Sequence, residues 1–488
     1  TVEVTAYPKV GDPNPIARLA ISDVSSGEQK WVDLSAYGTS EFIITRVGWK
    51  PDGKQLLYQV QNRIQTWLDL NSVDPSTAKT NKLLREESKA WVDVVELPVW
   101  LDDNTFVWQS DRTGWRHLYH YSAEGKLLGQ ITKGDWDVRQ LYGISKDDTW
   151  IYFLTSEHSQ ISNDLYRVRP DGSSFTRLSN ETADTRADFN PQFTSYIAFT
   201  STALQPTQTG LYSSDGKLVR VIEENHVPAL AEYNLVKPEF MQVKTRDGFV
   251  MEAMMIKPLD FDPNKKYPVM SYTYSGPAAP SVRNSWTGTR SLWHQFLAQK
   301  GYIIWICDNR SASAKGMQST YTSYRNFGEG ELRDLEDGVT YLKSLPFVDS
   351  QRIGLWGWSF GGFMTSFALT HSQSFKIGIA GGLVSDWHNY DSIYTERYMA
   401  LPSENKDGYE KSSVYKSAAN LHGKLMILHG VIDDNVHIQN SIQFVNALQF
   451  AGKDFQLMLY PQSRHGVVEA RRVKHMYTLM TKFVLENL

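Results

Sequence analysis

Residues 352–364 read RIGLWGWSFGGFM. The apolar residues 353–356 predict a short strand, and residues 363–369 predict a helix. Between them, Ser359 stands in a G-x-S-x-G pattern, which is typical of a nucleophile on a sharp strand-to-helix turn. The two glycines leave room for strained backbone and for substrate, while the N–H of Phe360 would point toward a developing oxyanion. A glycine-rich turn that contains a serine by chance would show the same pattern, so the rest of the sequence must decide whether Ser359 is a nucleophile.

Length and composition limit the classes of protein that fit. A chain of 488 residues predicts two domains, and its 41% hydrophobic and 12% aromatic content is that of a globular protein. The net charge of −4 comes without a basic stripe, so we expect no nucleic-acid partner. No apolar run reaches the length of a membrane span. The single cysteine, Cys307, excludes an internal disulfide and is expected in the core.

The first half of the chain repeats one β-rich unit. Turns containing Asp, Gly or Pro precede β-branched and aromatic strands that begin near Trp49, Trp100, Ser145 and Asn190, at spacings of 51, 45 and 45 residues. Such a period predicts propeller blades, with an irregular β-sandwich as the alternative. About four blades do not close a large propeller, so we expect residues 1–230 to be its C-terminal blades and an earlier stretch to supply the others.

The second half, residues 231–488, alternates strands and helices after a change of pattern near residues 226–238. A hairpin over residues 240–256 is followed by expected strands at 267–274, 302–307, 353–356, 377–380, 425–428 and 455–460, and by expected helices at 291–299, 332–342, 363–369, 442–448 and 472–485. This alternation predicts a doubly wound, mostly parallel sheet with helices on both faces, as in an α/β hydrolase. Active sites of such sheets lie at the carboxyl ends of the strands, where Ser359 is expected.

A serine hydroxyl needs a base and an orienting acid, which follow it in the order acid, then histidine, in α/β hydrolases. Asp433 comes just after the strand at 425–428 and is 74 residues past Ser359. His465 comes just after the strand at 455–460 and is 32 residues past Asp433. The competing candidates are Asp434, which could instead cap the helix beginning near Gln439, and the histidines His429, His437 and His475.

Several segments together resemble a known family. They are GWSFGGFM at 357–364, HGVIDDNVH at 429–437, SRHG at 463–466, YDSIYTERYM at 390–399 and YPKVGDPNP at 7–15. The chain resembles the prolyl oligopeptidase superfamily of serine peptidases, and within it the dipeptidyl peptidase IV branch. The likeness covers the whole expected hydrolase domain.

The resemblance implies a role for each matching residue. Ser359, Asp433 and His465 would form the catalytic triad, and the Tyr274 hydroxyl would join the Phe360 N–H in the oxyanion hole. Phe360 occupies a position where the family often has tyrosine. We expect this difference to matter little, because the backbone N–H of this residue, rather than its side chain, donates to the oxyanion. The walls of a proline-ring pocket would be Val384, Trp387, Tyr390, Tyr394 and Val436, and Asn435 would bind the carbonyl of the residue before proline.

One departure concerns the substrate amine. In the family a glutamate pair in a D-W-x-Y-E-E segment, helped by an earlier arginine, holds the free amine, and this sequence contains no such segment. We expect both to lie before Thr1.

The resemblance thus predicts a serine exopeptidase that releases X-Pro or X-Ala dipeptides from peptide N-termini, without a metal or organic cofactor. It also implies a homodimer and a periplasmic or extracellular location. The alternatives are a tripeptidyl or acylaminoacyl peptidase, an esterase of the same fold, or a truncated, catalytically disabled interaction protein.

Overall fold

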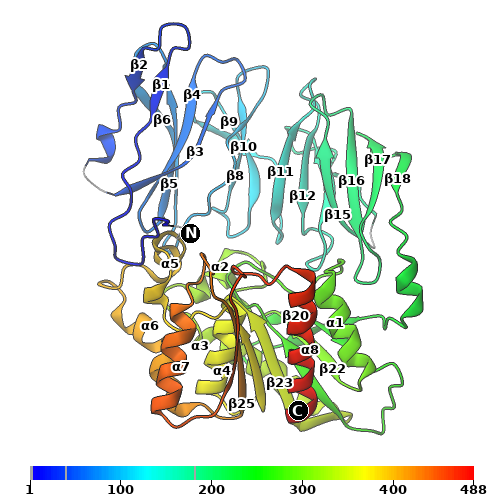
Figure 1. Cartoon of the computed structure of the whole chain (residues 1–488). Helices are drawn as coiled ribbons and strands as arrows, with labels where there is room; N and C mark the ends of the chain where they lie inside the picture. Colours follow the sequence, from blue (N-terminus) through cyan, green and yellow to red (C-terminus); the bar gives the residue numbers. More distant parts are fainter. Residues whose placement is uncertain (1–3, 39–40, 181–182) are drawn as a thin grey trace.

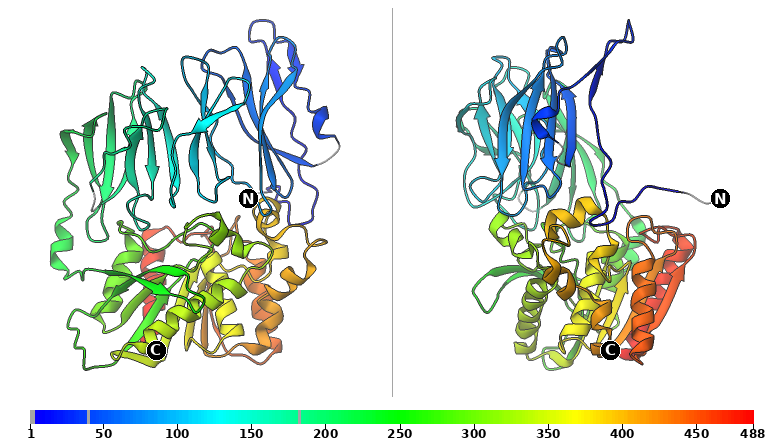
Figure 2. Two further views of the ribbon diagram at one scale, coloured as in Figure 1. Left: turned by 180° about the vertical axis from the view of Figure 1, so that it is seen from behind. Right: turned by 90° about the vertical axis from the view of Figure 1, so that its left-hand side faces the viewer.

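The computed structural model describes residues 4–38, 41–180 and 183–488. It has two layers, with antiparallel sheets above and an α/β unit below, and Figures 1 and 2 show this division from three sides. No helix among the described residues is both long and apolar enough to cross a bilayer.

The upper layer consists of four four-stranded sheets, in each of which every strand pairs with the next in antiparallel fashion. The first sheet contains β3 (Phe42–Trp49), β4 (Leu56–Asn62), β5 (Trp67–Val73) and β6 (Thr80–Glu87), and the second contains β7 (Val99–Trp100), β8 (Phe106–Ser110), β9 (His117–Tyr121) and β10 (Leu127–Gln130). The third sheet contains β11 (Val138–Ile144), β12 (Ile151–Thr155), β13 (Asp164–Val168) and β14 (Thr176–Arg177), and the fourth contains β15 (Asp184–Phe189), β16 (Ser195–Ser201), β17 (Gln208–Ser213) and β18 (Leu218–Glu223). A separate pair, β1 (Ala20–Ser22) and β2 (Gln29–Trp31), precedes them.

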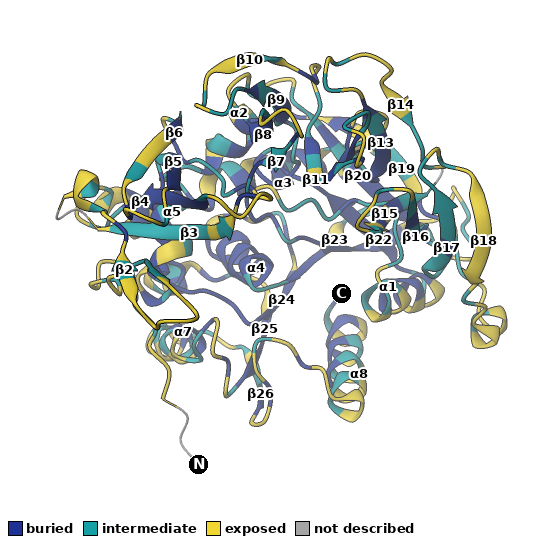
Figure 3. Ribbon diagram, turned by 90° about the horizontal axis from the view of Figure 1, so that it is seen from above, coloured by how far each residue is buried: buried dark blue, intermediate teal, exposed yellow. Residues whose placement is uncertain are grey.

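Successive sheets pack face to face along an arc that is open on one side when seen from above (Figure 3). Leu68 and Trp108 share a core between the first and second sheets, and Leu154 and Tyr196 share one between the third and fourth. Apolar cores between neighbouring four-stranded meanders are the packing of propeller blades. The predicted all-β, propeller-type part of the fold is therefore confirmed.

The lower layer is built on one eight-stranded sheet in the order β19-β20-β22-β21-β23-β24-β25-β26. Its strands are β19 (Glu239–Lys244), β20 (Val250–Ile256), β21 (Tyr267–Tyr272), β22 (Ile303–Cys307), β23 (Val348–Trp358), β24 (Ile377–Gly381), β25 (Lys424–Gly430) and β26 (Gln456–Tyr460). The first two form the predicted hairpin, β20 joins β22 antiparallel, and all later pairs are parallel. The predicted mostly parallel α/β-hydrolase sheet is thus confirmed.

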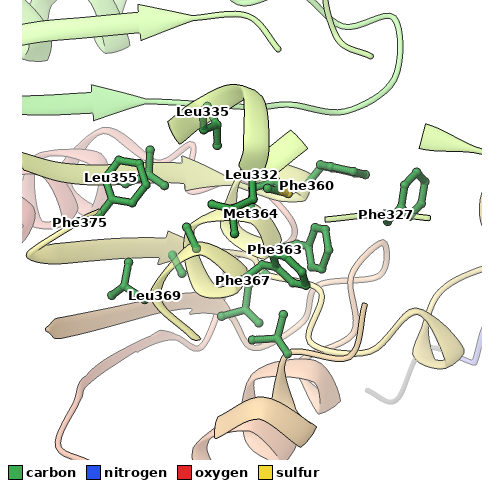
Figure 4. Close-up of a cluster of buried hydrophobic side chains, with 14 of the residues drawn as sticks. Phe327, Leu332, Leu335, Leu355, Phe360, Phe363, Met364, Phe367, Leu369 and Phe375 are labelled. Carbon is green, nitrogen blue, oxygen red and sulfur yellow. The ribbon is translucent and has the colours of Figure 1, made fainter. Parts of the chain in front are cut away.

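Helices cover both faces of this sheet. They are α1 (Thr289–Gln299), α2 (Met317–Thr320), α3 (Glu329–Ser344), α4 (Phe360–His371), α5 (Ser392–Met399), α6 (Lys406–Lys411), α7 (Gln439–Phe450) and α8 (Ala470–Asn487). Helices α3, α4 and α7 contribute to one core, and α1 and α8 to the other. Figure 4 shows part of the first core, where Phe363 and Phe367 of α4 belong to the same buried cluster as Leu332 and Leu335 of α3.

Strand β22 illustrates why this sequence forms a buried strand. Ile303, Trp305 and Cys307 point into the core of α3 and α4, whereas Ile304 and Ile306 point into the core of α1 and α8. A strand buried on both faces reads as an unbroken apolar run because successive side chains alternate between two cores. Cys307 is buried, as expected.

Several elements differ from the expectation, including some at the candidate site. Helix α4 begins at Phe360 rather than at residue 363, directly after Ser359, and β21 ends at Tyr272 rather than at Tyr274. The helix α5 was not expected at all.

Candidate active site

Ser359 stands at the point where β23 turns into α4. Its φ of 61° and ψ of −120° lie in a region that costs a non-glycine residue about 1–3 kcal/mol. Its N–H donates to the Gly381 carbonyl at 2.9 Å, and its carbonyl accepts from the Phe363 N–H at 2.9 Å. These bonds to β24 and α4 hold the strained turn, whose geometry is the one expected of a nucleophile elbow.

The glycines on either side of the serine are required by one neighbour. A Cβ on Gly357 would lie 2.4 Å from the Thr273 carbonyl oxygen, and one on Gly361 would lie 2.2 Å from the same atom. Both distances are far below van der Waals contact, so no side chain fits at either position. The turn is therefore pressed against the segment that carries Tyr274.

Asp433 and His465 meet at the same edge of the sheet. Asp433 follows β25, His465 follows β26, and the Nδ1 of His465 lies 2.8 Å from Oδ2 of Asp433. Because a carboxylate only accepts, Nδ1 carries the hydrogen, which leaves Nε2 able to take a proton from a serine. The other oxygen, Oδ1, accepts from the N–H groups of Asn435 at 3.0 Å and Val436 at 2.9 Å.

The surroundings of Asp433 favour its ionised form. Burial alone would raise its pKa, but hydrogen bonds from His429, His465 and the Asn435 N–H outweigh burial and hold the pKa well below its ordinary value. The carboxylate is thus charged wherever the protein is folded at moderate pH, as an orienting acid must be.

The competing residues have other partners. Asp434 pairs with Arg464, and α7 begins after Ile438 without a side-chain cap, so the alternative capping role of Asp434 is not observed. The His437 ring lies 4.1 Å from that of Tyr7, and the Nδ1 of His475 lies 3.1 Å from the Tyr460 hydroxyl oxygen. His429 is the exception, because it contacts Asp433 itself.

Ser359 and His465 open into one cavity of about 390 Å³. The cavity is lined by Tyr272, Tyr274, Arg290, Trp358, Ser359, Phe360, Val384, Trp387, Tyr390, Tyr394, Asn435 and His465. Nearly all the residues assigned by resemblance are thus brought together. Val436 is absent from this lining and completely buried in the core, so it can support the pocket wall only from behind.

The aromatic wall of the cavity is held by ring contacts and hydrogen bonds. The Trp387 ring stacks on Tyr394 at 6.2 Å between centroids, and Tyr390 meets Tyr394 edge to face at 5.4 Å. The Tyr390 hydroxyl donates to Oδ1 of Asn435 at 2.6 Å. This bond fixes the Asn435 amide with its oxygen toward Tyr390, so its nitrogen is available as a donor.

Two donors flank the serine. Burial raises the pKa of the Tyr274 hydroxyl, which keeps it protonated, although a hydrogen bond with Ser359 acts in the opposite direction. Phe360 is the first residue of α4, where a backbone N–H has no carbonyl partner within its own helix. Both groups can therefore donate to an oxygen bound above Ser359.

Sequence reasoning missed several neighbours of the site. Tyr7 donates its hydroxyl to the Asn435 carbonyl at 2.6 Å, although 428 residues separate the two. Trp358 donates its indole N–H to the His465 carbonyl at 2.7 Å, and Arg290 lines the cavity. Only Trp358, next to the nucleophile, carried a local signal that could have found it.

Known proteins resemble this chain over nearly all its length. The family model described as prolyl oligopeptidase family matches residues 289–488, and that of the dipeptidyl peptidase IV N-terminal region matches residues 1–209. The dipeptidyl peptidase 4 proteins of Trichophyton equinum and Trichophyton tonsurans are each 30% identical over 502 residues, which is 99% of this chain and 64% of theirs. The chain therefore spans less than two thirds of these curated relatives.

A solved structure completes the comparison. The crystal structure of Porphyromonas gingivalis dipeptidyl peptidase 4 superimposes with a TM-score of 0.94 at 33% identity, covering 99% of this chain and 68% of that one. Identity at this level, together with both family models and the shared fold, decides the assignment. This chain belongs to the prolyl oligopeptidase family of serine peptidases, in its dipeptidyl peptidase IV branch.

Proposed function

We propose that this chain carries the catalytic centre of a serine exopeptidase that releases X-Pro or X-Ala dipeptides from peptide N-termini. The observation that carries the proposal is the Asp433–His465 pair, 2.8 Å apart, which opens with Ser359 into a cavity with an aromatic wall. Residues 1–230 would be the propeller domain and residues 231–488 the catalytic domain.

The proposed reaction has two halves. The Oγ of Ser359 attacks the carbonyl carbon of the scissile bond while His465 takes the serine proton. Asp433 orients the imidazole and stabilises the charge that it gains. The oxyanion accepts hydrogen bonds from Tyr274 and the Phe360 N–H, an arrangement that supplies several kcal/mol in such sites. His465 then protonates the departing amine, and water cleaves the acyl-enzyme by the reverse proton path.

The pocket accounts for the proposed preference. Val384, Trp387, Tyr390 and Tyr394 offer flat apolar faces that fit a small rigid ring, or the smaller alanine side chain. The free amide nitrogen of Asn435 would donate to the carbonyl of the residue before proline. A larger side chain would meet rings that are already packed against one another.

A chromogenic X-Pro substrate with a free amino terminus, compared with its N-acetylated twin, tests the proposal. We expect hydrolysis of the X-Pro substrate and its loss in Ser359→Ala. A strong preference for the free amine would show that a site for the substrate amine is present. A preference for the acetylated twin would instead support an acylaminoacyl peptidase or esterase, and equal rates would mean a post-proline hydrolase without an amine site. Hydrolysis that survives in Ser359→Ala would refute the mechanism.

We propose also that the protein is a homodimer, on the basis of the family resemblance. Light scattering of the purified chain at micromolar concentration should give twice the chain mass, and a monomeric mass would contradict this.

A further inference from the structure

The charged residue of the cavity has no role in the mechanism above. Among the cavity-lining residues, Arg290 is the only one that is always charged, and none is a carboxylic acid. Tyr274 and the Phe360 N–H already serve the oxyanion, and His465 handles the proton. The cavity thus contains a positive charge that no acidic residue of the cavity lining balances.

Tyr272 holds Arg290 in place. Nη1 of Arg290 donates to the Tyr272 hydroxyl at 2.6 Å, and the guanidinium carbon lies 4.6 Å from the centre of that ring. A guanidinium has five N–H donors. Across residues 4–38, 41–180 and 183–488, no carboxylate forms an ion pair with Arg290 and no other hydrogen bond of its guanidinium is found. Most of its donors therefore remain available.

The sheet divides the cavity into two sides. Val384, Trp387, Tyr390 and Tyr394 belong to the core on the α3 and α4 face, whereas Tyr272 and Trp358 belong to the core on the α1 face. Arg290 is the second residue of α1 and lies with the latter. Ser359, at the end of the central strand β23, stands between an aromatic side and a side marked by a cation.

Charge decides which end of a substrate occupies each side. A free ammonium group is repelled by a guanidinium, so the amine end of an X-Pro peptide belongs on the aromatic side with Asn435. The leaving segment then passes His465, which protonates its amine, and reaches the side of Trp358 and Arg290. Trp358 connects His465 to the side of the cavity that contains Arg290, because its indole N–H donates to the His465 carbonyl at 2.7 Å.

We infer that Arg290 forms a subsite for a carboxylate in the leaving segment of the substrate. The carboxylate is either the C-terminus of a short peptide or an acidic side chain just past the scissile bond. The planar guanidinium suits it, since arginine binds carboxylates through paired N–H donors. This inference rests on the proposed function for the orientation of the peptide.

Binding to the Ser359→Ala variant tests the subsite without turnover. Calorimetry would compare Ala-Pro-Gly with its C-terminal amide, and Ala-Pro-Glu-amide with Ala-Pro-Gln-amide. We expect the charged member of at least one pair to bind about tenfold more tightly, as a charge-assisted hydrogen bond should. Preference in the first pair alone identifies the C-terminus, and preference in the second alone identifies the side chain. Either preference should shrink as salt is added.

Substitutions in the Ser359→Ala background assign the effect. Arg290→Gln should bring the charged-to-neutral affinity ratio to about one, and Arg290→Lys should retain part of it as a point charge. Arg18→Gln is the matched control, because the Arg18 guanidinium also stacks on a ring, 3.9 Å from the centre of Trp31, but lies outside the cavity. It should leave the ratio unchanged.

The outcomes separate this inference from the proposed function. Equal binding of charged and neutral peptides, or a preference that survives Arg290→Gln, overturns the subsite alone. Failure of the folded protein to bind any of the four peptides overturns both. A wild-type chain that binds with the expected preference but hydrolyses none of them overturns the proposed function and leaves the subsite standing.

Discussion

Asp433 accepts from four donors, and two of them are histidine rings. Besides His465, the Nε2 of His429 lies 3.3 Å from Oδ2 of Asp433 and 2.8 Å from the Val436 carbonyl oxygen. Both neighbours only accept, so Nε2 carries the hydrogen, and Nδ1 lies 2.7 Å from the Ser441 hydroxyl oxygen. His429 is completely buried, so it is placed to fix the position of the carboxylate that contacts His465.

His429→Leu should therefore lower kcat/KM about 10- to 100-fold, the effect of losing a hydrogen bond to a charged group. A carboxylate with one donor fewer holds protonated His465 more strongly, so the acidic limb of the kcat/KM profile should move to higher pH. His429→Gln, whose amide can still donate, should restore much of both. The measurement is a pH–rate profile of each variant.

His475→Leu is the matched control, because His475 is exposed and contacts Tyr460 rather than Asp433. This substitution should leave the pH–rate profile unchanged. An acidic limb that is identical in His429→Leu and the wild type would show that His429 only fills space.

At the scale of elements, α5 connects the cavity to the propeller layer. Its Tyr394 lines the cavity, while its Glu396, with no exposed surface, accepts from the Arg63 guanidinium twice at 2.6 Å and from the Gly11 N–H at 2.8 Å. Arg63 follows β4 of the first sheet. The N-terminal segment joins this contact, because the Val10 N–H donates to the Tyr390 carbonyl at 3.2 Å.

Arg63→Ala should lower the free energy of unfolding by about 3 kcal/mol, because it leaves a buried carboxylate without its cation. Urea denaturation followed by tryptophan fluorescence measures the loss. Arg46→Ala provides the comparison, since Arg46 and Glu96 form an exposed pair whose side chains are 40% and 69% accessible. That pair should contribute less than about 1 kcal/mol. Equal losses in the two variants would contradict the importance of the α5 contact.

The same helix shows where sequence reasoning stopped. The strands of the sheet could be predicted because their apolar runs alternate between two cores, as in β22. Helix α5 could not, because its buried positions include Ser392, Thr395 and Glu396, so no apolar period marks it. Burial of Glu396 depends on Arg63, 333 residues away in the chain.

The candidate site divides in the same way. Ser359, Asp433 and His465 could be proposed because each follows a strand, and parallel strands end at one edge of their sheet. The contacts of Tyr7, Arg290 and His429 could not be predicted. Each contact depends on how a loop or helix from a distant part of the chain packs against that edge. Such packing produces no regular residue spacing in the sequence from which it could be predicted.

At the scale of the whole molecule, three carboxyl groups with raised pKa values should contribute to how stability varies with pH. Burial raises the pKa of Asp137 to about 6, of Asp308 to about 6 and of Glu331 to about 7. A raised pKa means that the folded state binds the proton more tightly than the unfolded chain does. The stability from each group is complete below its unfolded pKa near 4 and is lost as pH rises through its folded value.

The contribution of these three groups to the free energy of unfolding should therefore fall between about pH 4 and pH 7, and Glu331, whose pKa is the highest of the three, is the group to test. Its Oε2 accepts from the Gly328 N–H at 2.8 Å and its Oε1 from the Ser311 hydroxyl at 3.2 Å. Glutamine stays neutral at every pH, and it can accept from the Gly328 N–H with its oxygen and donate its amide N–H to the Ser311 hydroxyl oxygen. Glu331→Gln should flatten the fall by about 2 kcal/mol, since one pKa unit is worth about 1.4 kcal/mol. Urea denaturation at each pH measures the slope, which the exposed substitution Glu28→Gln should not change. A slope that stays the same in Glu331→Gln would mean that the ionised carboxylate is as well accommodated at the start of α3 as the neutral acid.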